Sequence, residues 1–237
     1  NKMAKFSKII HENNENFLVK KFMRLFIQNL NKRLRIANRF SFVLTGGKSP
    51  IRLYNYLAKE KNIPWGKIDF FMGDERHVKE NSEHSNIKMC KKHLLNKIKI
   101  SDNQIYNIST RQVLIDDAIH YDVKIKNYFL RKRNKKVVFD LILLGIGQDG
   151  HIASLFKNTS YMNTKPNKLD HNVEMALRKD VSRITLNIRC INNSRTIFLW
   201  APGKSKSNIV KKILSDNKFK YPASFLRKKN NFLFHCN

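Results

Sequence analysis

The stretch FDLILLGIGQDGHIASLF, Phe139 to Phe156, carries more information about the fold than any other part of the chain. It begins within a run, Val137 to Leu144, that is apolar apart from Asp140 and whose length and composition predict a strand that is buried on both faces. Three glycines punctuate the turn that follows, and the same turn carries a carboxylate, Asp149, and an imidazole, His151. Because open parallel sheets bind ligands at the carboxyl ends of their strands, this turn is predicted to form part of a site.

Helix-like and strand-like segments alternate along the rest of the chain. Helical apolar spacing is found at 6–34, 51–61, 83–94, 115–130 and 205–214. Besides the run at 137–144, strands are expected at 41–45, 68–72, 173–177, 184–188, 196–201 and 232–235. Strands that alternate with helices predict an α/β fold of three layers, in which a mainly parallel sheet has helices on both faces.

The composition is that of a globular protein. The chain has 237 residues, 41% of them hydrophobic, and we expect residues 1–237 to form a single domain with a full core. No run reaches the length of a membrane span, and no signal peptide is visible. Three scattered cysteines argue against a disulfide framework and predict a reducing, cytoplasmic location. The chain begins at Asn1 rather than Met, so we expect it to be excised from a longer protein.

The net charge of +29 is extreme and has two explanations. A strongly basic protein can bind nucleic acid or another anionic surface. Here, however, the basic residues form no single stripe: their densest run is 131–136, and Lys and Asn are abundant even in the loop at 165–172. This spread is typical of a compositional bias. We therefore expect a mildly attractive field for a phosphorylated small-molecule substrate, without a specific nucleic-acid partner.

A second cluster, Thr45-Gly46-Gly47-Lys48-Ser49-Pro50, joins a predicted strand to a predicted helix. A glycine turn at this position presents backbone N–H groups that suit a phosphate, and Lys48 and Ser49 add further donors. The spacing of a Walker A loop is absent. Taken alone, the segment could equally be an ordinary helix start.

Charged residues gather at two other strand ends. Gly73-Asp74-Glu75-Arg76 comes directly after the strand at 68–72. These charges are consistent with two interpretations: part of a functional site, or a salt-bridged loop. Arg183 opens the stretch RITL, and Lys206 closes a strand-to-helix turn that begins at Gly203. Arg offers a bidentate fork to phosphate and Lys a point charge, although either could be a plain surface charge.

The order and spacing of these four clusters resemble the 6-phosphogluconolactonase family. The stretches that carry the resemblance are TGGKSP (45–50), GDERHV (73–78) with Ser85-Asn86 following, LGIGQDGHIASLF (144–156), and RITLNI…APGKSKS (183–188 and 201–207). The resemblance covers nearly the whole chain. It implies a Rossmann-like fold and hydrolysis of the δ-lactone made by glucose-6-phosphate dehydrogenase in the pentose phosphate pathway, with no metal or other cofactor. In some parasites the two enzymes are fused, so a fused or associated dehydrogenase is the expected partner.

The resemblance also implies roles for the site residues. His151 would be the base that activates water, and Asp149 would orient it. Arg76 would stabilise the developing oxyanion, with Asp74 and Glu75 positioning Arg76 or the sugar hydroxyls. The phosphate would be held by six residues: Gly46, Gly47, Lys48, Ser49, Arg183 and Lys206.

Three lysines depart from the pattern of the family: Lys48 replaces a usual Ser, and Lys79 and Lys157 replace common prolines. None of these positions is a central acid, base or glycine. Lys48 would add positive charge to the phosphate loop, which is compatible with the same function.

Three alternatives remain. Glucosamine-6-phosphate deaminases share the fold and the Asp-Gly-His, but they carry a Glu five residues after the His, where this chain has Phe156. A nucleic-acid-binding module needs aromatic residues interleaved with basic ones, whereas the aromatics here lie mostly in apolar runs. A metal site could use Cys90 and His93, one helical turn apart, with His84 nearby, but two or three such ligands form no complete set.

Overall fold

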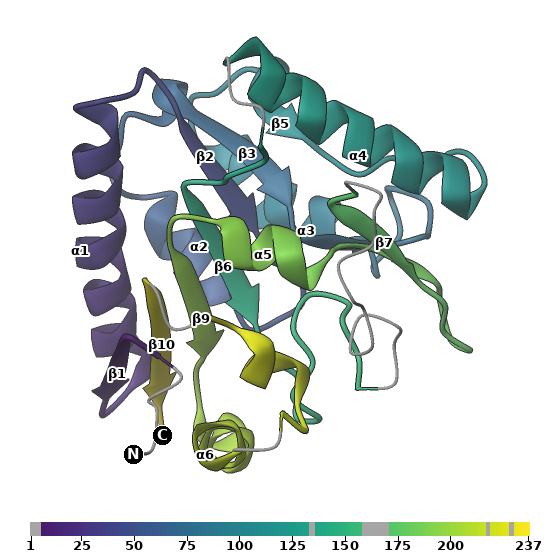
Figure 1. The fold of residues 1–237 in the computed structure, drawn as a ribbon. Helices are drawn as coiled ribbons and strands as arrows, with labels where there is room; N and C mark the ends of the chain where they lie inside the picture. The colour runs from purple at the N-terminus through teal and green to yellow at the C-terminus, as the bar shows by residue number, and fades with distance from the viewer. Residues whose placement is uncertain (1–5, 133–135, 158–170, 217–218, 228–229) are drawn as a thin grey trace.

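A seven-stranded parallel sheet forms the centre of the molecule in the computed structural model, which describes residues 6–132, 136–157, 171–216, 219–227 and 230–237 (Figure 1). The strand order is β1-β10-β9-β6-β2-β3-β5, and every pairing is parallel. The strands are β1 (Lys8–Glu12), β2 (Phe40–Leu44), β3 (Ile68–Met72), β5 (Ile105–Tyr106), β6 (Leu141–Gly145), β9 (Ile197–Ala201) and β10 (Asn231–Cys236).

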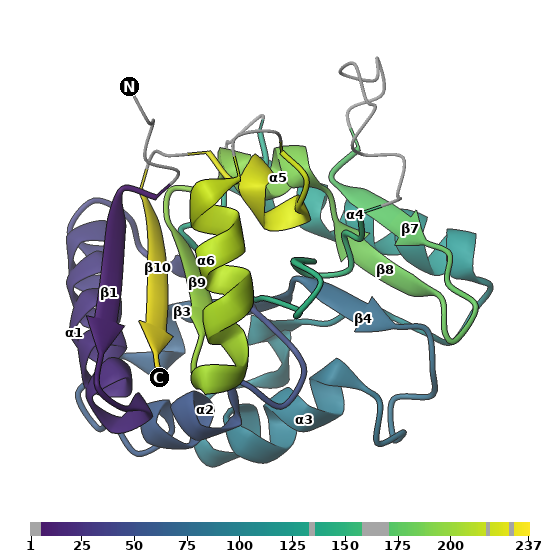
Figure 2. The ribbon, with the colours of Figure 1, turned by 90° about the horizontal axis from the view of Figure 1, so that it is seen from below.

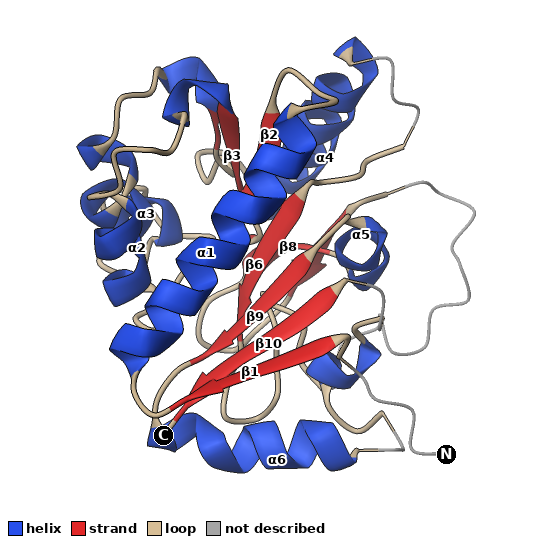
Figure 3. Cartoon of the chain, turned by 90° about the vertical axis from the view of Figure 1, so that its left-hand side faces the viewer, coloured by secondary structure: helices blue, strands red, loops and turns tan. Residues whose placement is uncertain are grey.

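The central strands are buried along their whole length because helices cover both faces of the sheet. All five residues of β2, β3 and β9 are buried. Helix α1 (Glu15–Leu34) lies across one face (Figure 3), where Phe22 packs against Trp200 with ring centroids 5.6 Å apart. Helix α4 (Leu114–Arg131) covers the other, where Tyr128 meets Phe71 at 4.9 Å. The predicted three-layer α/β fold is therefore confirmed.

Four shorter helices complete the layers. They are α2 (Ile51–Leu57), α3 (Asn86–His93), α5 (Ile188–Asn193) and α6 (Ser207–Ser215). Short 3-10 turns connect several elements, among them η5 (Lys204–Lys206), directly before α6. Within the described residues, no helix is both long enough and apolar enough to cross a membrane.

A second, three-stranded antiparallel sheet stands beside the carboxyl end of the parallel one (Figure 2). Its order is β4 (Asp74–Arg76), β8 (Arg183–Leu186), β7 (Val173–Ala176). Gly73 is the branch point between the sheets: its N–H donates to Leu44 O of β2 at 3.0 Å, and its carbonyl accepts from Leu186 N of β8 at 2.8 Å. A Cβ at this position would lie 3.3 Å from Leu44 O, so glycine permits the close approach.

Several sequence-based expectations were wrong in detail. The predicted helix at 6–34 is divided, because its first part forms edge strand β1, in which only Ile10 is buried and the periodic signal is weak. The apolar run at 137–144 becomes a strand only from Leu141. Strands β4 and β5 and helix α5 were not predicted, and the strands expected at 173–177 and 184–188 join the antiparallel sheet. Most of the polar loop expected at 158–172, and residues 133–135 of the basic run, lie outside the described residues.

Candidate active site

The turn after β6 brings Asp149 and His151 into contact. Asp149 Oδ1 lies 2.6 Å from His151 Nδ1 and accepts the His151 backbone N–H at 3.2 Å. Burial raises the pKa of Asp149, but the attraction and hydrogen bonds of His151 outweigh this effect, and the pKa ends below its usual value. Gly147 makes the arrangement possible, because a Cβ there would lie 2.1 Å from His151 Nδ1.

The rest of this turn is tied to the antiparallel sheet. Ser154 Oγ donates to Asp74 Oδ2 on β4 at 2.6 Å, and its backbone N–H donates to Thr185 Oγ1 on β8 at 3.2 Å. Ala153, directly before it, has a φ of 47°, in the left-handed region that few non-glycine residues occupy. The two hydrogen bonds of Ser154 thus hold the strained backbone of Ala153 in place, and they also fix the loop that carries His151.

Three arginines converge beside this loop. Arg76 and Arg183 are paired in register across β4 and β8, and Arg178 follows β7. The guanidinium carbons of Arg178 and Arg183 lie 4.1 and 5.1 Å from the centroid of the Phe156 ring. The same ring lies 4.6 Å from the imidazole of His151. Phe156 therefore connects the cationic cluster to the proposed base.

Arg183 is the most enclosed member of the cluster. Its side chain is only 14% exposed, and its Nε has no hydrogen-bond partner in the described structure. Burial lowers the pKa of Arg183; Asp180, 3.1 Å from its Nη2, opposes that effect, and Arg76 and Arg178 reinforce it. A buried donor without a partner among like charges favours an anionic ligand.

Glu75 has a different role from the one expected. Its carboxylate accepts backbone N–H groups of Arg76, Asn86 and Ile87 at 2.7 to 2.9 Å, so it caps the start of α3. The guanidinium of Arg76 instead donates to His84 O at 2.8 Å. Burial raises the pKa of Glu75 to about 7, although its backbone donors act in the opposite direction. Glu75 therefore fixes the start of α3 beside the site and does not hold the Arg76 side chain.

The glycine loop after β2 lies at the same edge of the sheet. Gly46 faces Asn86, whose Oδ1 is buried without a partner and would lie 1.9 Å from a Cβ at position 46. Gly47 has a φ of 80°, which other residues rarely adopt. Lys48 is exposed, and the carbonyl of Ser49 accepts from Trp200 Nε1 at 3.1 Å.

Lys206 approaches the turn that carries His151 from the end of β9. Its Nζ donates to Ile146 O at 2.7 Å. Burial lowers the pKa of Lys206, and attraction to Asp149 acts in the opposite direction. The structure thus places nine of the ten predicted site residues around one rim: Gly46, Gly47, Ser49, Asp74, Arg76, Asp149, His151, Arg183 and Lys206. Lys48 belongs to the same loop, and its side chain is exposed.

Comparison with known proteins identifies the family. The family model described as glucosamine-6-phosphate isomerases/6-phosphogluconolactonase matches residues 13–234. The chain belongs to this family. A 6-phosphogluconolactonase of Thermotoga maritima is 32% identical over 84% of this chain and 85% of its own length, and one of Synechocystis is 28% identical over 93% and 91%. The crystal structure of a 6-phosphogluconolactonase from Thermotoga maritima superposes with a TM-score of 0.80, at 28% identity, over 97% of this chain and 99% of that one.

Within this glucosamine-6-phosphate isomerase/6-phosphogluconolactonase family, the structure adds site residues that the sequence did not single out. Arg178 carries no motif and was indistinguishable from other surface charges. Ser154 and Asn86 lay within quoted motifs, but their contacts with Asp74 and Gly46 depend on the antiparallel sheet, which was not predicted. Within the described ranges, no three His, Cys, Asp or Glu side chains gather in a way that could hold a metal ion.

Proposed function

We propose that this protein is an enzyme that hydrolyses 6-phospho-D-glucono-1,5-lactone to 6-phosphogluconate in the pentose phosphate pathway. Its 6-phosphogluconolactonase relatives match it over most of their length. The observation that carries the mechanism is the Asp149–His151 pair at 2.6 Å, placed beside a cluster of three arginines. The pair supplies a base, and the cluster supplies positive charge for an anionic substrate.

His151 acts as general base. With Nδ1–H donated to Asp149, its Nε2 is left to accept a proton from water. The water oxygen attacks the lactone carbonyl carbon, and negative charge develops on the carbonyl oxygen. When the bond from that carbon to the ring oxygen breaks, His151 returns the proton to the ring oxygen. The products are one hydroxyl group and one carboxylic acid, which ionises at neutral pH.

Arg76 stabilises the oxyanion, and the remaining cations hold the phosphate. Arg183 and Lys206 pair with the phosphate oxygens, and the N–H groups of Gly46 and Gly47 face the same edge. Lys48 and Ser49 add donors at the mouth of the site. Because the phosphate is remote from the reacting carbon, its binding energy orients the lactone toward the water.

The family also contains glucosamine-6-phosphate deaminases, and Phe156 favours the lactonase. A deaminase must move protons between carbon and oxygen, which calls for a carboxylate close to the His. The ring of Phe156 occupies that place, 4.6 Å from the imidazole of His151. We expect hydrolysis of 6-phosphogluconolactone above its spontaneous rate and no ammonia release from glucosamine 6-phosphate. Catalytic ammonia release that His151→Ala abolishes would refute this assignment.

We also propose the cellular setting of the enzyme. The lactone is produced by glucose-6-phosphate dehydrogenase, so that enzyme is the expected fused or associated partner, and residues 1–237 act as the lactonase domain. Cys90, Cys190 and Cys236 are free and buried, which suits the reducing cytoplasm. Co-purification with dehydrogenase activity and cell fractionation test these two points.

A further inference from the structure

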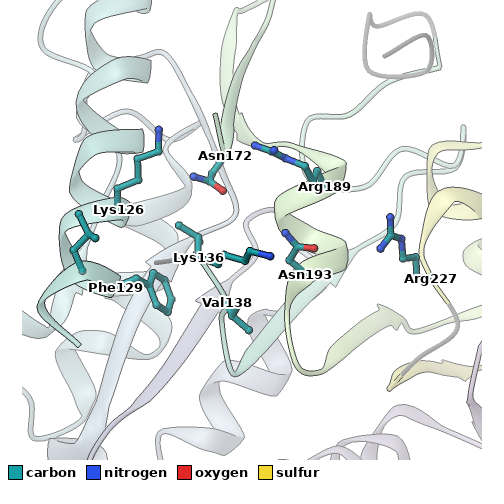
Figure 4. Close-up of a pocket in the computed structure, with 10 residues that line it drawn as sticks. Lys126, Phe129, Lys136, Val138, Asn172, Arg189, Asn193 and Arg227 are labelled. Atoms are coloured by element: carbon teal, nitrogen blue, oxygen red, sulfur yellow. The ribbon is translucent and has the colours of Figure 1, made fainter. Parts of the chain in front are cut away.

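Figure 4 shows a basic cavity that lies before the start of β6, whereas His151 follows the end of that strand. Its volume is about 510 Å³, within the range of small-molecule sites. The lining comes from the last turns of α4, the segment before β6, helix α5 and the segment before β10. Strand β6 runs from this cavity to the catalytic turn, and its five residues span about 17 Å. The cavity is therefore separate from the candidate active site.

The charge in this cavity is strongly one-sided. Four cationic side chains line it, Lys126, Lys136, Arg189 and Arg227, and no acidic residue does so among the described residues. Lys126 is neutralised by Asp122, whose carboxylate lies 2.7 Å from its Nζ. No ion pair joins Lys136 or Arg227 to a carboxylate in the part of the chain that the structure describes. These two cations are available to a ligand.

Neutral side chains give the cavity two chemically different walls. Asn172 and Asn193 contribute amides, and Figure 4 shows the side chains of Lys136 and Arg189 directed toward them. The Asn172 amide is held in place by its Nδ2, which donates to Asp122 at 3.2 Å. The apolar wall of the cavity is formed by four residues on the segments that also carry Lys126 and Lys136: Phe129, Leu130, Val137 and Val138.

We propose that this cavity binds the phosphate chain of a nucleotide, with the base against the apolar wall. Lys136 and Arg227 would pair with the phosphates, since free cations are the groups that recognise them in proteins. The size, the absence of acidic lining residues and the apolar wall together favour a nucleotide over inorganic polyphosphate, which has no part that an apolar wall would contact.

The site also has a structural connection to the arginine cluster. Asn172 lies directly before β7 and Arg189 shortly after β8, whereas Arg178 and Arg183 lie at the other end of the same two strands. A nucleotide in the cavity would contact the base of the β7–β8 hairpin whose tip carries two candidate substrate-binding arginines.

Isothermal titration calorimetry with ATP at physiological ionic strength tests the proposal. We expect the double variant Lys136→Ala/Arg227→Ala to bind ATP at least ten-fold more weakly, equivalent to about 1.4 kcal/mol. The matched control is Lys20→Ala/Lys211→Ala, which removes two exposed cations elsewhere and should bind as the native protein does. Thermal unfolding of both variants checks that they fold. The lactonase assay is not used, so this test is independent of the proposed enzymatic function.

Three results would overturn the proposal. The native protein could fail to bind ATP at millimolar concentration, or the double variant could bind it normally. The control could instead lose as much affinity as the double variant, which would indicate attraction by net charge alone. Tripolyphosphate that binds as tightly as ATP would assign the site to inorganic polyphosphate and refute the role of the apolar wall.

Discussion

Replacement of Arg183 tests whether this residue serves ligand binding rather than the stability of the fold. Its side chain is 14% exposed, its Nε lacks a partner, and Arg76 and Arg178 crowd it with like charge. In Arg183→Met an unbranched apolar side chain replaces the arginine stem, whereas the guanidinium is lost, and with it the charge and the contact with Phe156. A hydrogen bond to a charged group contributes about 1.5–3 kcal/mol, so binding of 6-phosphogluconate, the product, should weaken about 13- to 160-fold. The ligand-free protein should lose little stability, because relief of the repulsion among the arginines offsets the loss of the ion pair with the exposed Asp180.

Calorimetric titration with 6-phosphogluconate measures the affinity, and chemical denaturation measures the free energy of unfolding. Arg178→Met is the matched control: its side chain is 41% exposed, so we expect a smaller loss of affinity. An affinity of Arg183→Met within two-fold of the native value would show that the phosphate lies elsewhere. A large loss of stability would show that Arg183 is structural.

Asp149→Asn should lower kcat about 10- to 100-fold with little change in KM, because the charged hydrogen bond to His151 is weakened. Steady-state kinetics measure both constants, and an unchanged kcat would contradict the prediction. Since burial raises the pKa of Glu75 to about 7, the folded chain keeps a proton between about pH 4.5 and 7 that the unfolded chain loses. Rising pH across this range should therefore destabilise the native protein relative to Glu75→Gln, by up to about 3 kcal/mol. Denaturation across this range measures the difference, and a constant difference refutes the assignment. Gly147→Ala should lower kcat at least ten-fold while circular dichroism stays native, since a methyl group would displace the imidazole; normal turnover would count against the geometry.

The strength of the local signal decided which parts of the fold could be predicted. Strands β2, β3 and β9 are buried on both faces and are mostly apolar in sequence, so they were placed within a residue or two. Strand β1 buries one residue of five, and β5 has only two residues. Edge strands of this kind are specified by their partners in the sheet rather than by their own sequence.

The candidate site shows the same division. Asp149 and His151 are two residues apart, and a glycine-rich turn after a buried strand brings them together, so their pairing could be expected. The contact between Ser154 and Asp74 joins residues 80 positions apart and requires the antiparallel sheet. We expected Glu75 to position Arg76 or the sugar hydroxyls, but its carboxylate is directed at the N-terminus of α3 by backbone donors whose positions depend on the fold.

The most direct test of the account is hydrolysis of freshly prepared 6-phosphogluconolactone, followed through 6-phosphogluconate dehydrogenase, by the native protein and by His151→Ala. The account predicts turnover above the spontaneous rate for the native protein and a kcat lower by about two to four orders of magnitude for the variant, the usual contribution of general acid–base catalysis. Native protein that only matches the spontaneous rate, or a folded His151→Ala that turns over normally, would contradict it.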